Sequence, residues 1–329
     1  MRAVVIARIG GPEALEVRDV PRPEARGDRI LVRVRAAGLN RADTLQSRGM
    51  YPAPPGDPAD IPGLEFAGEV EEKGPDAIGP LRPGDRVFGI VGGGGLAEYV
   101  ALPERMAVPI PENLDWAAAS AVPEAFLTAF DAIDHQAELR SGEAVLIHAV
   151  GGGVGSAAVQ IAKAMGCPTF GTARTAEKLE RLKEYGLDVG IDTSAEDFVA
   201  VVRERTDGLG VPAIIDHVGG PYLANDLAAL ATRGRIVVVG LLGGRKAELD
   251  LAALLAKRAR IVGTTLRARP IEQKIAVTRR FADRVVPWLA RGLVRPIVDR
   301  AFPIDQVVEA ARHVESNQGF GKVVLTMDP

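Results

Sequence analysis

The most regular pattern of apolar and polar positions lies between Ala144 and Arg174. It opens with a short apolar run, 144–149, which is too short for a helix and is typical of a buried parallel strand. After a glycine cluster, apolar residues return from Val154 to Met165 at i, i+3, i+4, i+7, i+8 and i+11. This spacing predicts a helix with one face packed on a sheet. Gly166 ends the helix, and 169–172 is a second predicted strand.

Strands and helices continue to alternate after this unit, which indicates an α/β fold with a doubly wound parallel sheet. A helical stretch, 115–135, leads into it, and a helix is predicted at 196–206. The further predicted strands are 189–191, 211–216, 235–240 and 260–264. Ligands of such sheets bind at the carboxyl ends of the strands. The predicted cofactor rim is therefore 149–153, 218–220, 240–243 and 264–267.

Residues 1–123 follow a different pattern, with short strands separated by glycine and proline. Residues 30–36 alternate with a period of two, as a strand with one polar face does. This pattern favours a compact, barrel-like β domain. The tail has a long predicted helix (271–291), a strand, a helix and a closing strand (322–325), and we expect it to complete the first domain. The predicted domains are 1–123 with 269–329, and 124–268.

The glycine cluster predicts a dinucleotide site, because glycines allow a tight turn and let the backbone approach a pyrophosphate. Gly151, Gly152, Gly153 and Gly155 stand between the first strand and its helix, but Val150 takes the place of the first glycine of G-x-G-x-x-G. Glycine turns also join ordinary strands and helices. The strand and helix on either side favour the nucleotide site.

The end of the second strand favours NADP over NAD. An NAD site carries an acidic residue about 20 residues after the glycines, whereas this chain has Thr172, Arg174 and, four residues later, Lys178. Two cations and a hydroxyl suit the 2′-phosphate of NADPH. The alternative is an ordinary solvated helix start, since surface Arg and Lys are common.

Composition narrows the class of protein. The net charge of −3 argues against a nucleic-acid surface as the main function. Cys167 is the single cysteine, so neither a disulfide framework nor a thiolate zinc site can form within the chain. The N-terminal residues show no secretory pattern, and no apolar run approaches the length of a membrane span. We expect a cytoplasmic protein.

Several motifs in order cover the whole chain. They are AAGLNRADTLQSRGMYPAPPG (36–56), IPGLEFAGEV (61–70), LRPGDRVFGI (81–90), VPEAFLTAF (122–130), the glycine-rich run of 142–163 and FGKVVL near the end. With them the chain resembles the zinc-independent, zeta-crystallin-like quinone oxidoreductases of the medium-chain dehydrogenase/reductase superfamily. The resemblance implies a GroES-like barrel domain beside a Rossmann NADP-binding domain. It also implies a homodimer paired through the edge strand at 260–264.

The resemblance also says which relatives are excluded. Zinc alcohol dehydrogenases of the superfamily carry a cysteine where Asn40 stands and a histidine where Leu64 stands. Glu65 remains, but a catalytic zinc site needs about three protein ligands. The four histidines are scattered without ligand spacing, and we interpret them as structural, with His217 a possible exception near the predicted rim: His135, His148, His217 and His313. No metal site is expected.

Without a Lewis acid, the acceptor must already be reactive, as quinones and α,β-unsaturated carbonyls are. Of these acceptors the resemblance implies a quinone, so the chain is predicted to be an NADPH:quinone oxidoreductase. An NADPH-dependent alkene (enal or enone) reductase is the nearest alternative. A third possibility is an NADPH-binding protein with a structural or RNA-binding role, which the net charge disfavours.

The resemblance suggests four residues for catalysis, each with a plainer alternative. Asn40 is an amide donor or only a turn cap, and Tyr51 is a phenol donor or only part of a proline-rich lid. Thr128 contacts the nicotinamide or is satisfied by its own helix, and Arg267 borders the pocket or is a surface charge. The predicted cofactor-binding residues are Val150, Gly151, Gly152, Gly153, Val154, Thr172, Arg174, Lys178, Val218, Gly240, Leu241, Leu242, Thr265, Leu266 and Lys322.

Overall fold

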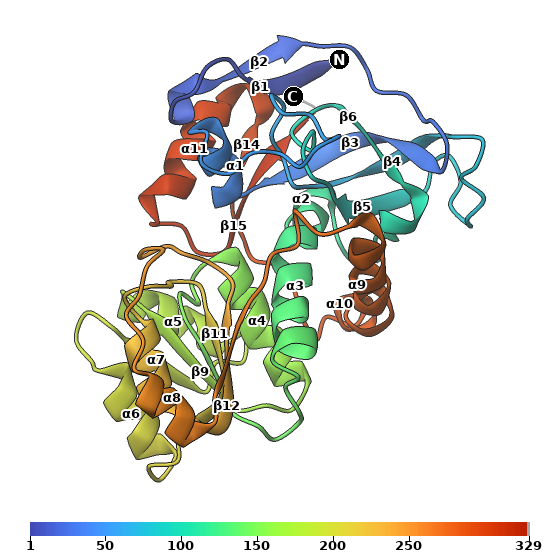
Figure 1. The fold of residues 1–329 in the computed structure, drawn as a ribbon. Coiled ribbons are helices and arrows are strands. Elements are labelled where there is room, and N and C mark those ends of the chain that lie inside the picture. Colours follow the sequence, from blue (N-terminus) through green and yellow to red (C-terminus); the bar gives the residue numbers. More distant parts are fainter. Residues whose placement is uncertain (328–329) are drawn as a thin grey trace. The chain divides into compact units, whose positions relative to one another are not determined.

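The computed structural model describes residues 1–327, and the chain folds into two units. Unit 1 holds Met1–Leu127, Leu266–Ala290 and the chain from Pro296 onward, whereas unit 2 holds Thr128–Thr265 and Arg291–Arg295. The chain colours of Figure 1 show the consequence in unit 1, where red C-terminal elements lie among blue N-terminal strands. The expected α/β architecture, a parallel sheet accompanied by a mainly antiparallel one, is confirmed.

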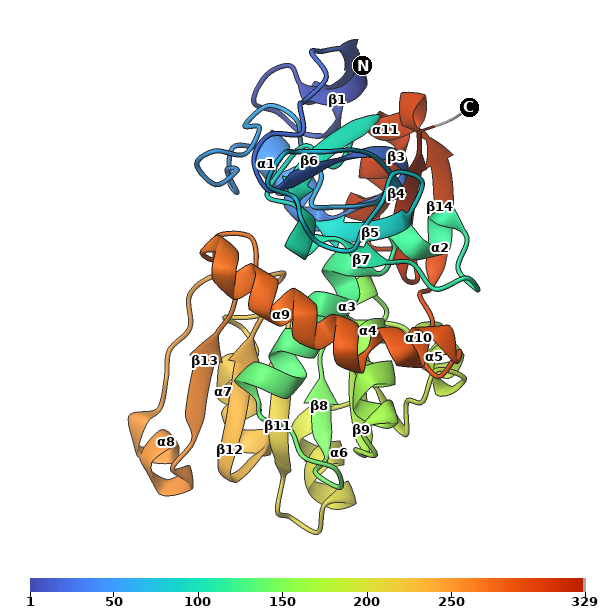
Figure 2. The ribbon, with the colours of Figure 1, turned by 90° about the vertical axis from the view of Figure 1, so that its right-hand side faces the viewer.

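Unit 2 is built on a six-stranded sheet in the order β10-β9-β8-β11-β12-β13. Every neighbouring pair in it is parallel. Figure 2 shows β13, β12, β11, β8 and β9 side by side in that order. The chain starts in the middle at β8 and winds first to one edge and then to the other, so that strand order reverses between β8 and β11. The strands are β8 (Val145–Ile147), β9 (Thr169–Ala173), β10 (Val189–Asp192), β11 (Val211–Asp216), β12 (Leu230–Val238) and β13 (Arg260–Gly263).

Helices connect these strands as right-handed crossovers require. They are α4 (Gly153–Ala164), α5 (Ala176–Lys183), α6 (Phe198–Arg205), α7 (Leu223–Ala229) and α8 (Leu251–Lys257). The apolar spacing of 154–165 does form a helix, and Gly166, with φ +77°, ends it. Two helices precede the sheet, α3 (Pro123–Phe130) and the π-helical turn η3 (Asp131–Gln136).

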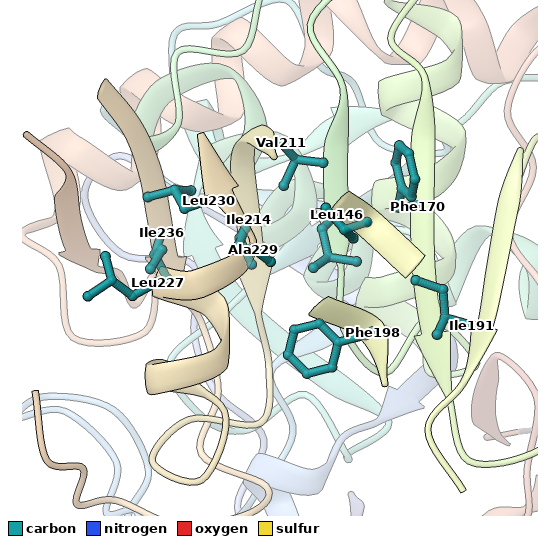
Figure 3. Packing of buried hydrophobic residues seen from close by; sticks show 11 residues of the cluster. Leu146, Phe170, Ile191, Phe198, Val211, Ile214, Leu227, Ala229, Leu230 and Ile236 are labelled. Carbon is teal, nitrogen blue, oxygen red and sulfur yellow. The ribbon is translucent and has the colours of Figure 1, made fainter. Parts of the chain in front are cut away.

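One face of this sheet carries the hydrophobic core shown in Figure 3. Leu146, Phe170 and Ile214 project from neighbouring strands against side chains of α6 and α7, including Phe198 and Leu227. All five are at most 5% exposed. Burial of a large apolar side chain contributes about 1.5–3 kcal/mol, so this packing fixes the strands whose carboxyl ends form the predicted rim.

Unit 1 is a seven-stranded sheet in the order β14-β15-β3-β4-β5-β7, with β6 also paired to β3, and a separate β1-β2 hairpin. All its pairs are antiparallel except β14 with β15. The strands are β1 (Arg2–Ile6), β2 (Leu15–Asp19), β3 (Arg29–Leu39), β4 (Glu65–Lys73), β5 (Arg86–Ile90), β6 (Tyr99–Pro103), β7 (Val108–Pro109), β14 (Val298–Pro303) and β15 (Lys322–Thr326).

The last strand decides the site in unit 1, because β15 pairs with β3 and places Val323 opposite Leu39. The same pairing makes neighbours of Asn40 and Lys322, which are 282 positions apart in sequence. The helices of unit 1 are short apart from α9 and α11. They are η1 (Pro12–Ala14), α1 (Arg41–Ser47), η2 (Glu104–Met106), α2 (Trp116–Ser120), α9 (Ile271–Arg284), α10 (Val286–Ala290), η4 (Ile304–Gln306) and α11 (Val307–Ser316).

Two predicted helical stretches are interrupted in the structure. The helix expected over 271–291 is divided at Val285 into α9 and α10. Pro287 lies just beyond the break, and a proline ring clashes with the carbonyl four residues earlier and removes one N–H donor. The stretch 115–135 is divided in the same way before Pro123. Within residues 1–327, no helix combines the length and the apolarity that crossing a membrane requires.

Candidate functional site

The glycine turn of unit 2 joins β8 to α4. Ala149 has φ +53°, a left-handed conformation that costs a non-glycine residue about 1 kcal/mol or more. Its carbonyl accepts a hydrogen bond from the Gly152 N–H at 3.2 Å, and α4 begins at Gly153. The first amides of a helix have no partner within the helix and carry its partial positive charge. The turn therefore offers N–H donors to a phosphate.

Gly155 is required for close packing of α4 on the turn. A Cβ at this position would lie 2.6 Å from the Ala149 carbonyl oxygen and 2.7 Å from Val150 Cα. Both are backbone atoms, so the clash has no flexible partner to relieve it. This is the role that the last glycine of a dinucleotide-binding fingerprint has, close helix–strand packing.

Val150, the departure from the glycine pattern, is fully buried. A Cβ on Gly171 of the neighbouring β9 would lie 2.8 Å from Val150 Cγ1. The missing side chain at Gly171 thus makes room for the added one at Val150. Because the Val150 side chain is enclosed, only its backbone can take part in the predicted cofactor contact.

The end of β9 differs in one respect from the sequence-based picture. Thr172 is 2% exposed, and its Oγ1 lies 2.9 Å from His148 Nδ1. His148 Nε2 is 2.7 Å from Asp226 Oδ1, and the ring packs edge-on against Phe198 and Tyr222. Burial raises the pKa of Asp226. The Thr172 hydroxyl is therefore part of a buried hydrogen-bond chain with His148 and Asp226, and not of the predicted phosphate site with Arg174 and Lys178.

The two cationic side chains predicted to bind the 2′-phosphate, Arg174 and Lys178, both belong to unit 2. Arg174 is exposed just after β9, and Lys178 is half-buried on α5. The stem of Lys178 passes over the glycine turn, since a Cβ on Gly151 would lie 2.7 Å from Lys178 Cδ. This places an ammonium-bearing side chain against the turn that offers the phosphate-binding amides.

Two further segments of the predicted rim, 218–220 and 240–243, are joined by backbone hydrogen bonds at or beside their ends. The Val218 carbonyl accepts from the Gly243 N–H at 2.8 Å, and the His217 carbonyl accepts from the Leu242 N–H at 3.1 Å. Asp216 Oδ1 caps the first segment by accepting from the N–H groups of Val218 and Gly219. Leu242 is 53% exposed, which leaves it available to a ligand.

His217, the possible exception among the histidines, is buried at the end of β11. Burial, aided by nearby His148, lowers the pKa of His217 to about 4. Its Nε2 has no hydrogen-bond partner within residues 1–327. The ring is neutral at physiological pH and retains one unused polar atom at the predicted rim.

Unit 1 contains a buried charged site that we call the polar cluster, made of Asn40, Glu65, Glu124 and Lys322. Lys322 Nζ lies 2.5 Å from Glu65 Oε1 and 2.5 Å from Asn40 Oδ1. Asn40 Nδ2 donates to Glu65 Oε1 at 2.9 Å, and the Glu124 N–H donates to Glu65 Oε2 at 2.8 Å. Glu65 is fully buried and Lys322 is 6% exposed. The cluster thus contains a buried ion pair, and both oxygens of the Glu65 carboxylate accept hydrogen bonds.

Neighbouring residues fix the position of this cluster. A Cβ on Gly38 would lie 2.2 Å from Glu65 Oε1, so only glycine leaves room for the carboxylate. Asp43, also fully buried, accepts from the N–H groups of Asn40 and Gly63 at 2.8 and 2.9 Å. Burial raises the pKa of Asp43 to about 6. Asn40 is therefore held from both its backbone and its side chain.

The side chain of Arg267 is buried in unit 1, with 6% exposure, so Arg267 is not a surface charge. Its Nε donates to the Gly92 carbonyl at 2.8 Å, and its guanidinium also donates to the Tyr51 carbonyl at 2.9 Å and to Gln46 Oε1 at 2.5 Å. The guanidinium lies 5.0 Å from the centre of the Tyr51 ring. Arg267 thereby holds the proline-rich loop that carries Tyr51.

The predicted site residues divide between the two units. Within unit 1, Asn40 contacts Lys322, and Tyr51 contacts Arg267. Leu266, which precedes Arg267 in the sequence, is buried. Thr128 and the predicted cofactor residues from Val150 to Thr265 belong to unit 2. Sequence reasoning did not single out three members of the unit 1 site. They are Asp43, Glu65 as the partner of Lys322, and Glu124, although all three lie in the quoted motifs.

Comparison with known proteins agrees with this geometry. Residues 26–112 match the alcohol dehydrogenase GroES-like domain, and 153–283 match the zinc-binding dehydrogenase family. The quinone oxidoreductase of Rattus norvegicus is 31% identical over 99% of this chain and 98% of its own length. A solved NAD-dependent alcohol dehydrogenase is 33% identical, with TM-score 0.89 over 99% of this chain and all of its own. Escherichia coli quinone oxidoreductase, solved with NADPH, is 25% identical, with TM-score 0.88 over 99% and 100%.

The name of one matched family implies zinc, but the donors of the unit 1 site do not fit a zinc ion. Leu64 has no ligand atom, and Asn40 and Glu65 are engaged with the Lys322 ammonium. The Lys322 side chain thus occupies the place beside the Glu65 carboxylate that a cation would need. Among residues 1–327, no group of three or more His, Cys, Asp or Glu side chains is placed to hold a metal ion.

Proposed function

Because the chain belongs to the quinone oxidoreductase branch of the medium-chain dehydrogenase/reductase superfamily, we propose that it is an NADPH:quinone oxidoreductase. The observation that carries the proposal is the Lys322–Glu65–Asn40 arrangement in place of a zinc donor set. A site of this kind has no Lewis acid for activating an alcohol. It suits an acceptor that is already electron-poor, as a quinone is.

The residues of unit 2 fit a phosphorylated dinucleotide. A bound NADPH would supply the hydride. The amides at the start of α4 would hold the pyrophosphate, and Arg174 with Lys178 would neutralise the 2′-phosphate. The exposed Leu241 and Leu242 of the loop after β12 would cover the cofactor, beside Gly240 and Val218. The relative solved with NADPH supports this choice of cofactor.

The proposal gives a positioning or donor role to each predicted catalytic residue, of which three lie in unit 1 and Thr128 lies in unit 2. Arg267 would keep the Tyr51 loop in place, and Asn40, held by Lys322, would orient the acceptor. Tyr51 and Thr128 remain proposed contacts to the acceptor and the nicotinamide. None of these four side chains is essential by itself in this scheme, so Tyr51→Phe should slow turnover only modestly.

Side-by-side steady-state assays test the function. NADPH oxidation is measured with a quinone and with an enal under the same conditions. Faster turnover of the quinone supports the proposal, and faster turnover of the enal indicates an alkene reductase. Binding of NADPH without turnover of either acceptor would point to an NADPH-binding protein, and the quinone oxidoreductase proposal would then be wrong.

Cofactor preference gives a sharper prediction. Arg174→Ala should raise the KM for NADPH about tenfold and leave the KM for NADH nearly unchanged, because an exposed cation paired with a phosphate contributes about 1–2 kcal/mol. Arg233→Ala is a matched control, because this exposed arginine lies in the first half of β12, away from the carboxyl ends of the strands where the cofactor rim is predicted. Equal effects on both cofactors would contradict the assignment.

We also propose a homodimer that pairs through β13, and a cytoplasmic location. β13 is an edge of the parallel sheet, so one side of its backbone is unpaired within unit 2. The neighbouring α8 exposes Leu251 and Leu255 at 63% and 75%. Light scattering should give a mass near twice the 34.7 kDa of one chain. A mass of one chain at micromolar concentration would refute the dimer.

A further inference from the structure

Glu124 is the one member of the polar cluster whose side chain the proposed mechanism does not use. It lies in the first turn of α3, within the motif VPEAFLTAF. Its backbone N–H donates to Glu65, but within residues 1–327 its carboxyl oxygens accept no hydrogen bond. A half-buried carboxyl without a hydrogen-bond donor is unusual, because burial of an unpaired charge is costly.

The charges around Glu124 explain how this arrangement is stable. Glu65 on β4 and Asp43 on α1 act to keep it protonated, whereas Lys322 on β15 and Arg267 favour its ionised form. Burial is the largest influence, and with Glu65 it raises the pKa of Glu124 to about 8. The start of α3 opposes this shift, but a helix terminus contributes only about 0.3–1 kcal/mol. Because the influences that raise the pKa outweigh those that lower it, the carboxyl of Glu124 stays protonated at neutral pH.

Exposure separates Glu124 from the other two carboxyl groups. Glu65 and Asp43 are fully buried and committed to donors inside unit 1. Glu124 retains partial access to solvent, so it can release a proton to a bound molecule and recover one from water. A carboxylic acid kept neutral by its surroundings is a recognised device for donating a proton at neutral pH.

We propose that Glu124 is the proton donor to the reduced acceptor, and that its burial beside the Glu65 carboxylate keeps it protonated until the acceptor is reduced. The inference rests on the proposed function. Hydride addition leaves a negative charge on the acceptor oxygen, as a hydroquinone monoanion or an enolate. The Glu124 O–H bond then breaks, a new O–H bond forms on the acceptor, and the resulting carboxylate regains a proton from solvent. NADPH is oxidised to NADP⁺, and the acceptor gains two electrons and two hydrogens.

The decisive variant is Glu124→Gln, which keeps the size of the side chain but cannot transfer a proton. Glu124→Asp retains the acid, and Glu112→Gln is the matched control, since Glu112 is an exposed glutamate of the same unit. Single-turnover oxidation of bound NADPH by a quinone and by an enone is followed over a range of pH. Infrared difference spectra of the protein without cofactor report the protonated carboxyl group directly.

The expected results are specific to a proton donor. Glu124→Gln should slow the single turnover about 10- to 100-fold, leave NADPH affinity within about threefold and remove an alkaline loss of rate centred near pH 8. Glu124→Asp should restore part of the rate and its pH dependence, and Glu112→Gln should behave as the wild type. The infrared band of a protonated carboxyl, titrating near pH 8, should disappear in Glu124→Gln alone.

Protein stability supplies a second readout without cofactor. Glu124 in the folded chain holds a proton that the unfolded chain has released, so the wild type loses stability as pH rises from about 5 to about 8. Glu124→Gln should lack this loss. A wild-type turnover that persists unchanged in Glu124→Gln would overturn the inference but keep the proposed function. Absence of wild-type turnover with both acceptors would overturn both.

Discussion

Lys322→Met should destabilise unit 1 by about 3–5 kcal/mol, which is the typical cost of leaving one partner of a buried ion pair without the other. Glu65 is fully buried, and its Oε1 lies 2.5 Å from the Lys322 ammonium. The substitution would leave the carboxylate with only the amide donors of Asn40 and Glu124. Urea unfolding at neutral pH measures the loss.

Two further variants distinguish the lost charge from lost packing. Lys322→Met combined with Glu65→Gln removes both charges and should recover most of the stability. Lys183→Met is the matched control, because Lys183 forms an exposed pair with Glu180 and its loss should cost less than about 0.5 kcal/mol. A loss below about 1 kcal/mol for Lys322→Met alone would show that the pair is not the centre of the site. The same variant tests the predicted contact of Lys322 with the cofactor, since NADPH affinity can be measured on the folded fraction.

Gly155→Ala should weaken NADPH binding by about tenfold or more and destabilise unit 2 by about 1–3 kcal/mol. In a helix without steric conflict, replacing glycine by alanine stabilises by about 1 kcal/mol. Here the added Cβ would lie 2.6 Å from the Ala149 carbonyl oxygen and 2.7 Å from Val150 Cα. The helix must move away from the turn, and the phosphate-binding amides move with it. Isothermal titration with NADPH and urea unfolding measure the two effects.

Gly263→Ala is the control for this change. Gly263 lies at the end of β13, where an added Cβ would meet no atom of the chain within 4 Å and the backbone is not left-handed. The substitution should therefore change neither NADPH binding nor the free energy of unfolding by more than about 0.5 kcal/mol. If Gly155→Ala binds NADPH as tightly as Gly263→Ala does, close packing at the turn is not what shapes the phosphate site.

The polar cluster shows why part of the site was outside the reach of sequence reasoning. Asn40 and Lys322 could each be singled out from their motifs, but their hydrogen bond spans 282 residues. No local pattern encodes the antiparallel pairing of β15 with β3 that brings them together. From the sequence, Glu65 was interpreted only as one carboxylate that is insufficient for a zinc site. The structure shows that it is the counter-ion of Lys322. The protonation state of Glu124 likewise depends on charges from four separate segments.

The helical and strand pattern of unit 2, in contrast, was largely readable from the chain. Apolar spacing along 144–174 reports local backbone geometry, because a helix repeats every 3.6 residues and a strand every two. The division of 271–291 was missed although Pro287 stands in it, since proline within four residues of a helix end can be tolerated or can break the helix. The burial of Thr172 and the partner of its hydroxyl were also beyond local patterns.

By itself the sequence determined the alternating strands and helices, the glycine turn at the start of α4 and the lack of zinc donors at Asn40 and Leu64. The first two follow from residue types and short-range spacing, and the third follows from the resemblance to a superfamily whose zinc-dependent members have their ligands at those positions. Only the tertiary structure decided that an ammonium group neutralises Glu65, that Val150 fits because Gly171 lacks a side chain, and that Arg267 is buried. Such outcomes depend on which distant segments share a dry interior, where every charge must find a partner and every added methyl group must find space.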